Sequence, residues 1–256
     1  MPFDSSAREE EIEPVFAAFG KLDEAAYGEL RDLCYPLAYR AGDLLCKVDM
    51  PPIGLFVIGQ GMIKYGKVLA CGLRPPVLRI LGPGDLLGVE PLFQDEPGPS
   101  NHFARAMTDV QACFIPFDPL MRFLERQPEA LYCMGTHLVR QLQRYECRLA
   151  EWTCGSVKVN AARLLLCLDT RFGQPSPAGR VLTISRQDLA DLANTHVDTM
   201  SRVLSQFKND GWIETAPHNI TLRNQRRLAQ AADPLPYCLV HQHRHPASAV
   251  ERPCRS

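Results

Sequence analysis

The sequence has no long apolar run, no excess of one charge and no closely spaced pair of cysteines. Its 256 residues hold 28 Lys and Arg against 29 Asp and Glu, and 46% are hydrophobic. This composition excludes a disordered chain, a collagen-like fibre and a strongly basic histone-like protein. No stretch approaches the roughly 18 apolar residues of a membrane span. The first residues are acidic, unlike a secretory signal, so we expect a soluble, cytoplasmic protein without membrane contact.

Cysteine is abundant but not arranged as a structural framework. None of the ten cysteines is spaced as Cys-x-x-Cys. A long chain without a secretory signal is expected to keep its thiols reduced. Buried free cysteines behave as small hydrophobes, which is the ordinary interpretation here. A subset acting as metal ligands or as a redox sensor is the alternative.

Charge is unevenly distributed along the chain. Residues 1–30 hold eight acids against two bases, a net of −6, whereas residues 155–232 hold ten bases against six acids, a net of +4. This asymmetry suits a C-terminal half that meets a polyanion. A face with so small an excess is also often only solvated.

Short apolar runs separated by Gly and Pro extend from about residue 37 to residue 117. Residues 55–58 precede the turn at Gly59 and Gly61, and residues 77–81 precede a second turn at residues 82–85. Several short strands at this spacing are typical of an all-β sandwich or barrel, with the glycines supplying positive φ in the turns.

Residues 119–154 show the period of a helix. Apolar and aromatic residues alternate in steps of three and four, which is the spacing of a coiled-coil seam. This pattern predicts a dimerisation helix, and the alternative is an amphipathic helix that packs only on its own domain. The expected dimer seam consists of Leu131, Leu138, Leu142, Tyr145, Leu149 and Trp152.

The signals for a helix-turn-helix gather between residues 185 and 222. Ser185 and Asp188 form a capping box for a short helix, and Asn194 tolerates the left-handed φ of a tight turn. A second helix is predicted over 196–210, followed by a two-stranded hairpin over 212–222. This order is typical of a winged helix-turn-helix, and the alternative is a small helical pair with an exposed polar face.

The segments 184–190 and 197–202 resemble those of CRP/FNR transcription regulators, and the acid-x-x-Ser-Arg pattern resembles the FNR branch. The resemblance implies base contacts by Asp198, Ser201 and Arg202, since Arg suits guanine and an acid accepts from cytosine. His196 stands where Ser or Thr usually caps this helix, so Thr195 would take over the cap, or His196 would touch phosphate. The implied DNA-binding residues are Arg186, Thr195, His196, Val197, Asp198, Thr199, Ser201 and Arg202.

The N-terminal part resembles the same family at residues 41–43, 59–65, 82–85 and 113–117. The resemblance implies an α+β protein with a cyclic-nucleotide-binding-type β-roll, a long dimerisation helix and a C-terminal winged helix-turn-helix. The expected divisions are an acidic segment over 1–20, the β-roll over 21–118, the dimerisation helix over 119–154, the DNA-binding domain over 155–232 and a disordered tail over 233–256.

The expected effector pocket departs from that of the cAMP-responsive members. Those members place an acid after a Gly and then an Arg-Ser pair for the phosphate, whereas this chain has Val89 and, further on, Ser100 and Asn101. No arginine follows until Arg105. Because a cyclic phosphate needs a cation and donors, cAMP is not the expected effector.

Cys113 occupies the position of the internal cluster-ligating cysteine of the FNR branch. No cysteine precedes Cys34, so the usual ligands of an iron–sulfur cluster are missing, and Cys34 and Cys46 would have to stand in. Three interpretations remain open for these candidate sensor residues: buried hydrophobes, a metal or iron–sulfur site, and a thiol switch.

These observations predict a homodimeric regulator that binds a palindromic site in double-stranded DNA and is not an enzyme. The family resemblance adds RNA polymerase as a partner, and the cysteines favour a redox, oxygen or metal-cluster signal over cAMP. Two alternatives stay open: a regulator that binds an unidentified small molecule in the β-roll, and a thiol- or metal-dependent enzyme.

Overall fold

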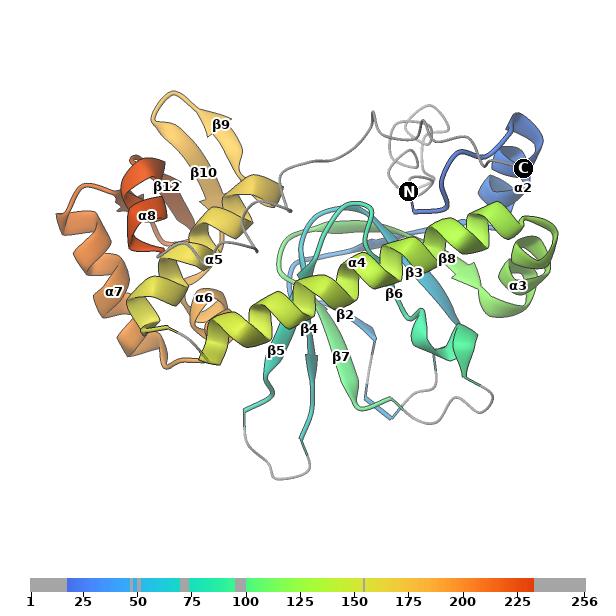
Figure 1. Cartoon of the computed structure of the whole chain (residues 1–256), viewed down its shortest axis with the longest axis horizontal. Coiled ribbons are helices and arrows are strands. Elements are labelled where there is room, and N and C mark those ends of the chain that lie inside the picture. The colour runs from blue at the N-terminus through green and yellow to red at the C-terminus, as the bar shows by residue number, and fades with distance from the viewer. Residues whose placement is uncertain are drawn as a thin grey trace, which may run out of the picture. The chain divides into compact units, whose positions relative to one another are not determined.

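The structure is a computed structural model that describes residues 18–46, 48–49, 52–69, 74–94, 100–153 and 155–232. It divides into two compact units, residues 1–143 and 144–256, which we describe one at a time (Figure 1). The expected disordered tail lies outside the described residues. The same is true of the expected acidic segment, apart from residues 18–20.

The first unit is built on two four-stranded antiparallel sheets. The first sheet has the order β1 (Tyr35–Tyr39), β8 (Val110–Pro116), β3 (Gly54–Gln60) and β6 (Leu86–Leu87). The second sheet has the order β2 (Leu44–Cys46), β7 (His102–Ala106), β4 (Ile63–Lys67) and β5 (Val77–Leu81). The short 3₁₀ helix η1 (Glu90–Phe93) follows β6. These strands confirm the all-β architecture predicted by the spaced apolar runs and the β-roll implied by the family resemblance.

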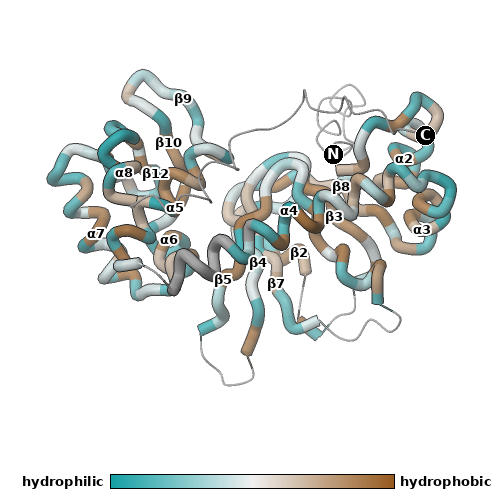
Figure 2. Tube along the Cα trace, in the orientation of Figure 1, coloured by the Kyte–Doolittle hydropathy of each residue, from teal (hydrophilic) through white to brown (hydrophobic). Residues whose placement is uncertain are grey.

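Alternation along the strands divides the core of this unit into two clusters. On β8, Ala112 joins the cluster shared by the two sheets, whereas Cys113 and Ile115 join the cluster between the first sheet and the helices. The side chains of a strand point alternately to its two faces, so both faces of the first sheet are buried. Figure 2 shows the hydrophobic residues of this unit in brown along its strands and helices.

Three helices cover the outer face of the first sheet: α2 (Glu24–Asp32), α3 (Phe117–Arg126) and α4 (Pro128–Thr153). The expectation of one helix over 119–154 needs correction, because α3 and α4 are separate. Gln127 has φ −122° and ψ 71°, outside the helical region. Proline disfavours helical backbone in the residue before it and is well suited to the first position of a helix, so Pro128 ends α3 and begins α4.

The second unit contains α5 (Val157–Phe172), α6 (Arg186–Leu192), α7 (Val197–Asn209) and α8 (Gln225–Ala231). Its sheet has the order β11 (Ile213–Thr215), β12 (Asn219–Leu222), β10 (Gly179–Thr183) and β9 (Gln174–Ser176). The predicted hairpin is present as β11 and β12, but it belongs to a larger sheet. No helix among the described residues is long and apolar enough to span a membrane.

Candidate nucleic-acid interface and sensor site

The turn between α6 and α7 has the geometry that its sequence predicts. The Asp188 backbone N–H donates to the Ser185 hydroxyl at 3.0 Å, and that hydroxyl donates to the Asp188 carboxylate at 2.5 Å. Asn194 has φ +48°, a left-handed conformation that Asn adopts more readily than most residues. The capping box and the Asn turn are therefore both confirmed, and together they set α7 against α6.

The start of α7 differs from one expectation. His196 is the N-cap residue and makes no side-chain capping hydrogen bond, and α7 begins at Val197. Thr195 does not take over the cap, because it lies one residue too early and its backbone N–H bonds to the Ala190 carbonyl at 2.9 Å. The first N–H groups of α7 therefore have no side-chain cap, which suits a helix end that faces an anion.

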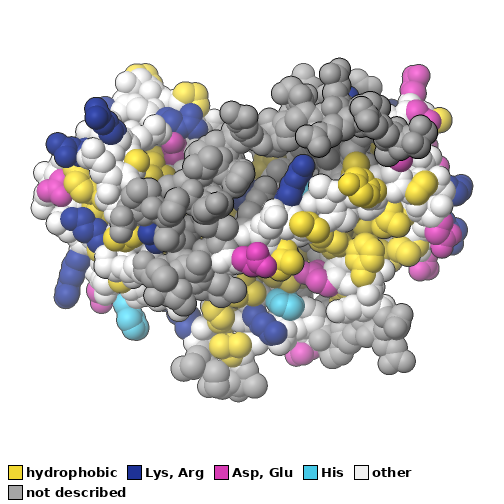
Figure 3. All heavy atoms as spheres, viewed as in Figure 1, with side chains coloured by type: hydrophobic (Ala, Val, Ile, Leu, Met, Phe, Trp, Pro, Cys, Tyr) yellow, Lys and Arg dark blue, Asp and Glu magenta, His cyan; other side chains and the backbone are white. Residues whose placement is uncertain are grey.

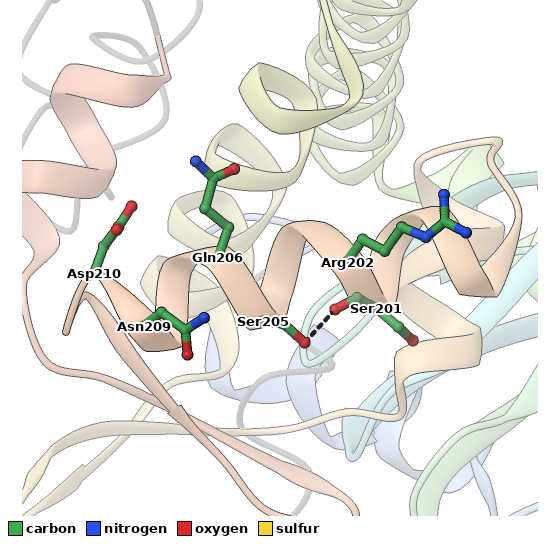
Figure 4. Close-up of a pocket in the computed structure, with 6 residues that line it drawn as sticks. All are labelled: Ser201, Arg202, Ser205, Gln206, Asn209 and Asp210. Atoms are coloured by element: carbon green, nitrogen blue, oxygen red, sulfur yellow. Dashed lines mark hydrogen bonds between the residues drawn. The ribbon is translucent and has the colours of Figure 1, made fainter.

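One face of α7 anchors the helix and the opposite face is polar. Met200, Leu204 and Phe207 are buried in the core. Phe207 also stacks on Trp212, with ring centroids 5.1 Å apart. The polar face carries a shallow, open depression lined by six residues (Figure 4): Ser201, Arg202, Ser205, Gln206, Asn209 and Asp210.

The predicted DNA-binding residues lie at the start of α6, at the two positions before α7 and along the first half of α7. Four of them are exposed and four are half-buried. The exposed ones are Arg186, His196, Asp198 and Arg202, and the half-buried ones are Thr195, Val197, Thr199 and Ser201. Ser205, Gln206 and Asn209 continue the polar face and are not among the predicted DNA-binding residues. Ser205 and Gln206 lie four residues after Ser201 and Arg202, respectively, and Asn209 lies four and three residues after Ser205 and Gln206, so helical spacing was the available signal.

The outer face of α4 bears a stripe of exposed apolar residues. Leu131 and Tyr132 begin it, and Val139 and Leu142 continue it with 56% of each side chain exposed. Apolar side chains also gather on this face in Figure 3. We call these four residues the apolar stripe.

The apolar stripe does not coincide with the predicted dimer seam. Leu138 packs on the helix-side core of its own chain and Tyr145 is half-buried, whereas Leu131 and Leu142 are exposed as predicted. The side chains of Leu149 and Trp152 lie outside the described residues. The exposed surface is therefore turned around the helix axis relative to the prediction, because part of the heptad serves the chain's own core.

The three candidate sensor cysteines do not form one site. Cys34 and Cys113 are neighbours: Cys113 is paired with Pro36 across β8 and β1, and Cys34 packs against the helix-side cluster that contains Cys113. Cys46 packs instead in the cluster between the sheets. Because Cys113 points to the helix side of the first sheet, that sheet separates it from Cys46.

A metal or iron–sulfur site does not fit this donor set. Iron–sulfur clusters are usually held by four cysteine thiolates. Within the described ranges, no group of three or more His, Cys, Asp or Glu side chains is arranged to hold a metal ion. The hydrogen bond to Cys113 and burial raise the pKa of Cys34 well above its usual range, and burial raises the pKa of Cys46 to about 11. Both thiols are therefore mainly protonated at neutral pH, and they react slowly because the thiolate is the reactive form.

The structure also brings together a polar network that the sequence reasoning missed. Arg79 on β5 donates to the Gln141 side-chain oxygen on α4 at 2.8 Å. Its guanidinium lies 4.3 Å from the centroid of the Tyr65 ring and 3.8 Å from the Glu90 carboxylate. The Arg79 side chain is only 11% exposed. We call this set, together with His137 and His102, the Arg79 network.

The rest of the Arg79 network consists of two histidine contacts. The Gln141 side-chain amide lies 2.8 Å from His137 Nε2, and His102 stacks on Tyr65 with ring centroids 5.1 Å apart. Burial lowers the pKa values of Arg79 and His102 and raises that of Tyr65. A buried cation thus lies beside α4, although Arg79 is far in sequence from the Ser100 region where a phosphate-binding arginine was sought.

Comparisons with known proteins agree with both units. Residues 36–127 match the model of the cyclic nucleotide-binding domain, and residues 161–231 match that of the Crp-like helix-turn-helix domain. The chain is 28% identical over 216 residues to the CRP-like cAMP-activated global transcriptional regulator of Mycobacterium tuberculosis, covering 84% of this chain and 95% of that one. It is 30% identical over 179 residues to the transcriptional regulator LdrP of Thermus thermophilus, covering 70% of this chain and 87% of that one.

A solved structure shows the same fold. A CRP-family transcriptional regulator from Thermus thermophilus superposes with a TM-score of 0.68 at 24% identity, covering 77% of this chain and 96% of that one. The chain belongs to the CRP/FNR family of transcription regulators, which bind DNA through a helix-turn-helix. These relatives are regulators rather than enzymes, in keeping with the expectation that the chain is not an enzyme.

Proposed function

We propose that the chain is a cytoplasmic homodimer that reads a palindromic site in double-stranded DNA with α7 and acts with RNA polymerase. The observation that carries the proposal is the outer face of α7, where Asp198 and Arg202 are exposed while Met200, Leu204 and Phe207 anchor the helix. A helix that is rigidly held and polar outside suits the major groove.

The pattern of readers on α7 favours the FNR branch. Arg202 would bond the O6 and N7 edge of guanine, and Asp198 would accept from cytosine N4. Asp198 is one methylene shorter than the Glu of that branch, so its base contact is expected to be the weaker of the two. Arg186, Thr195, His196, Val197, Thr199 and Ser201 would contact phosphates or complete the base contacts.

The apolar stripe supports dimerisation through α4. Exposed apolar residues that recur along one helix face are typical of a helix that has a partner. A Cβ added at Gly135 would meet nothing within 4 Å, so a second helix has room to approach there. Two copies related by a two-fold axis would present their recognition helices about 34 Å apart, which corresponds to the two halves of a palindrome.

The proposed signal is oxidation of the Cys34 and Cys113 thiols to a disulfide, rather than cAMP binding. The two thiols lose two protons and two electrons to a low-molecular-weight disulfide, which is reduced to two thiols. The contact between the thiols supports this form of the redox signal over a metal or oxygen-sensing cluster. The raised pKa of Cys34 predicts slow oxidation, suited to sustained stress.

A different effector remains an alternative, because one relative is named for activation by cAMP. A small molecule in the β-roll would have to enter beside the Arg79 network, where Arg79 is bonded to Gln141 and packed on Tyr65. Adding cAMP is therefore expected to leave DNA affinity unchanged. Tighter binding with cAMP would replace the redox signal by this alternative.

Selection from a random DNA library followed by anisotropy titrations tests the DNA-binding proposal. The wild-type chain should enrich a palindrome and bind it more tightly than a scrambled duplex. Arg202→Ala should cost about 1–3 kcal/mol on the palindrome and relax the preference at one position of each half-site. Arg226→Ala, an exposed change on α8, is the matched control. Equal losses on both duplexes with Arg202→Ala would make Arg202 a phosphate contact.

A further inference from the structure

The contacts between α4 and the β-roll are apolar near the start of the helix and polar further along. Near its start, Ala130 and Met134 are buried in the helix-side core. Apolar contacts of this kind are not directional, and they hold the start of the helix against the sheet. Further along, Gln141 is buried and accepts a hydrogen bond from the Arg79 guanidinium at 2.8 Å. A bond from a charged donor is directional and strong.

Arg79 is itself held in place by the β-roll. It lies over the Tyr65 ring, which is packed on His102, and it lies beside the Glu90 carboxylate. Burying a cation is costly unless its partners are positioned, and here β4, η1 and α4 all supply them. The guanidinium is therefore held by Tyr65 and Glu90 of the β-roll and by Gln141 of α4, all of which belong to this chain.

Gln141 lies at a sensitive point of α4. Val139 and Leu142, which flank it, are two of the exposed residues of the apolar stripe. A rotation of α4 about its axis would exchange the residues that face outward, because neighbouring residues on a helix are about 100° apart. The helix then continues to Thr153, and α5 of the DNA-binding unit begins at Val157.

We propose that Arg79 is a positioning residue that sets the rotation of α4 through Gln141 and so gives DNA-binding competence without a small-molecule ligand. The inference rests on the proposed function, because DNA binding is its readout. Arg79 lies on β5, whereas the proposed DNA-reading residues lie on α7 and the apolar stripe lies on α4. Its guanidinium joins β5 to α4 through Gln141, so an external effector is not needed to connect the β-roll to this helix.

A double-mutant cycle on the full chain tests the proposal. Arg79→Met keeps the length of the side chain without its charge, and Gln141→Leu removes the acceptor. Each single variant should bind the selected palindrome about tenfold more weakly. The double variant should lose no more affinity than whichever single variant binds the palindrome more weakly, because both changes break the same bond. Unchanged affinity, or losses that add, would overturn the proposal.

Two further variants separate positioning from a general loss of stability. Gln141→Glu should keep wild-type affinity, because a carboxylate accepts from both Arg79 and the Nε2–H tautomer of His137. Arg105→Met is the control: Arg105 lies on β7 of the same sheet, is exposed, and donates to the Gly42 carbonyl at 2.7 Å. It should leave DNA affinity unchanged. Equal losses with Arg105→Met and Arg79→Met would reduce Arg79 to a structural role.

Hydrogen exchange supplies a readout that does not depend on DNA. In Gln141→Leu, the amides of α4 near residue 141 should exchange faster while those of β3 and β8 stay protected. Faster exchange throughout the β-roll would contradict a local role. If the wild-type chain selects no palindrome, the proposed function fails. If the wild type binds and both single variants bind equally well, only the positioning role of Arg79 fails.

Discussion

The two units use their polar residues in opposite ways. In the DNA-binding unit, Asp198 and Arg202 stand exposed on a helix whose other face is buried. In the first unit, residues 1–143, which we call the sensor unit, Arg79 and Gln141 turn inward and are hydrogen-bonded to one another. The first arrangement leaves donors and acceptors available for a partner, and the second uses a guanidinium N–H of Arg79 and the Gln141 oxygen in a contact within the chain. The comparison indicates that the DNA-binding unit binds an external ligand while the sensor unit holds its own geometry.

Unlike the Arg79 network, the apolar stripe of the first unit faces outward, where a partner could contact it. Its disruption should have the largest effect on DNA affinity. Leu142→Glu places a charge at the C-terminal end of the stripe and should yield monomers in analytical ultracentrifugation. The palindrome should then be bound roughly 1,000-fold more weakly, because the two half-sites no longer act together. The expected cause is loss of avidity, with each recognition helix intact.

Gln143→Glu is the matched control for this prediction. It adds the same charge at an exposed position one residue away, and Gln143 is not part of the apolar stripe. It should remain dimeric and bind the palindrome as the wild type does. A Leu142→Glu variant that sediments as a dimer would exclude the stripe as the dimer contact.

Local signals account for what the sequence predicted well. Ser185 with Asp188, the turn at Asn194 and the end of α7 near Gly211 each depend on residues within a few positions of one another, and all three are found. Backbone preferences of this kind are set by short-range sterics and hydrogen bonds. The helix-turn-helix, and with it the expected readers on α7, could therefore be placed from the amino-acid sequence alone.

Long-range contacts account for what the sequence did not predict. Arg79 and Gln141 are 62 positions apart, and no periodicity relates them. The grouping of Cys34 with Cys113, without Cys46, depends on which face of β8 each residue meets. The register of strand pairing decides which side chains of β8 face the helices, and a shift of one residue would move Cys113 to the opposite face. The break at Pro128, in contrast, was a local signal that the heptad pattern obscured.

An inward polar cluster also occurs in the DNA-binding unit, and it sharpens the comparison. The buried Asp169 carboxylate accepts from Arg180 Nε at 2.8 Å and from the Gln225 amide at 2.5 Å. Asp169→Ala should lower the free energy of unfolding by about 2–3 kcal/mol, since it leaves both donors without this acceptor. Urea denaturation measures this change. The folded variant should bind DNA normally.

Glu214→Ala provides the comparison for Asp169→Ala. Glu214 accepts from Arg223 at 2.7 Å, but both side chains are exposed. Exposed pairs contribute about 1 kcal/mol or less. If both variants lose the same stability, burial is not what distinguishes the Asp169 cluster.

The Cys34 and Cys113 pair tests whether any inward group of the sensor unit responds to an external signal. Prolonged treatment with oxidised glutathione should change DNA affinity by about tenfold, on the scale of a typical coupling energy between two sites. Cys113→Ser should abolish the difference. Cys46→Ser, whose thiol packs in the other core cluster, should retain it. A wild-type chain that is equally active in both redox states would remove the thiol signal from the proposed function.

The smallest expected effect concerns His102 and the acid limit of stability. Burial lowers the pKa of His102, the positive charges of Lys67 and Arg79 lower it further, and Glu90 opposes them. The unfolded chain therefore binds the proton more readily, with a pKa near 6.5. The contribution of neutral His102 is complete above that pH and is lost as the pH falls through the folded-state pKa. His102→Asn should reduce the stability difference between pH 7.5 and pH 5.5 by less than about 1 kcal/mol, measured by urea denaturation.

His218→Asn, at an exposed position before β12, should leave that difference as it is. An unaltered pH dependence in His102→Asn would mean that the stacking on Tyr65 does not depend on the charge of His102.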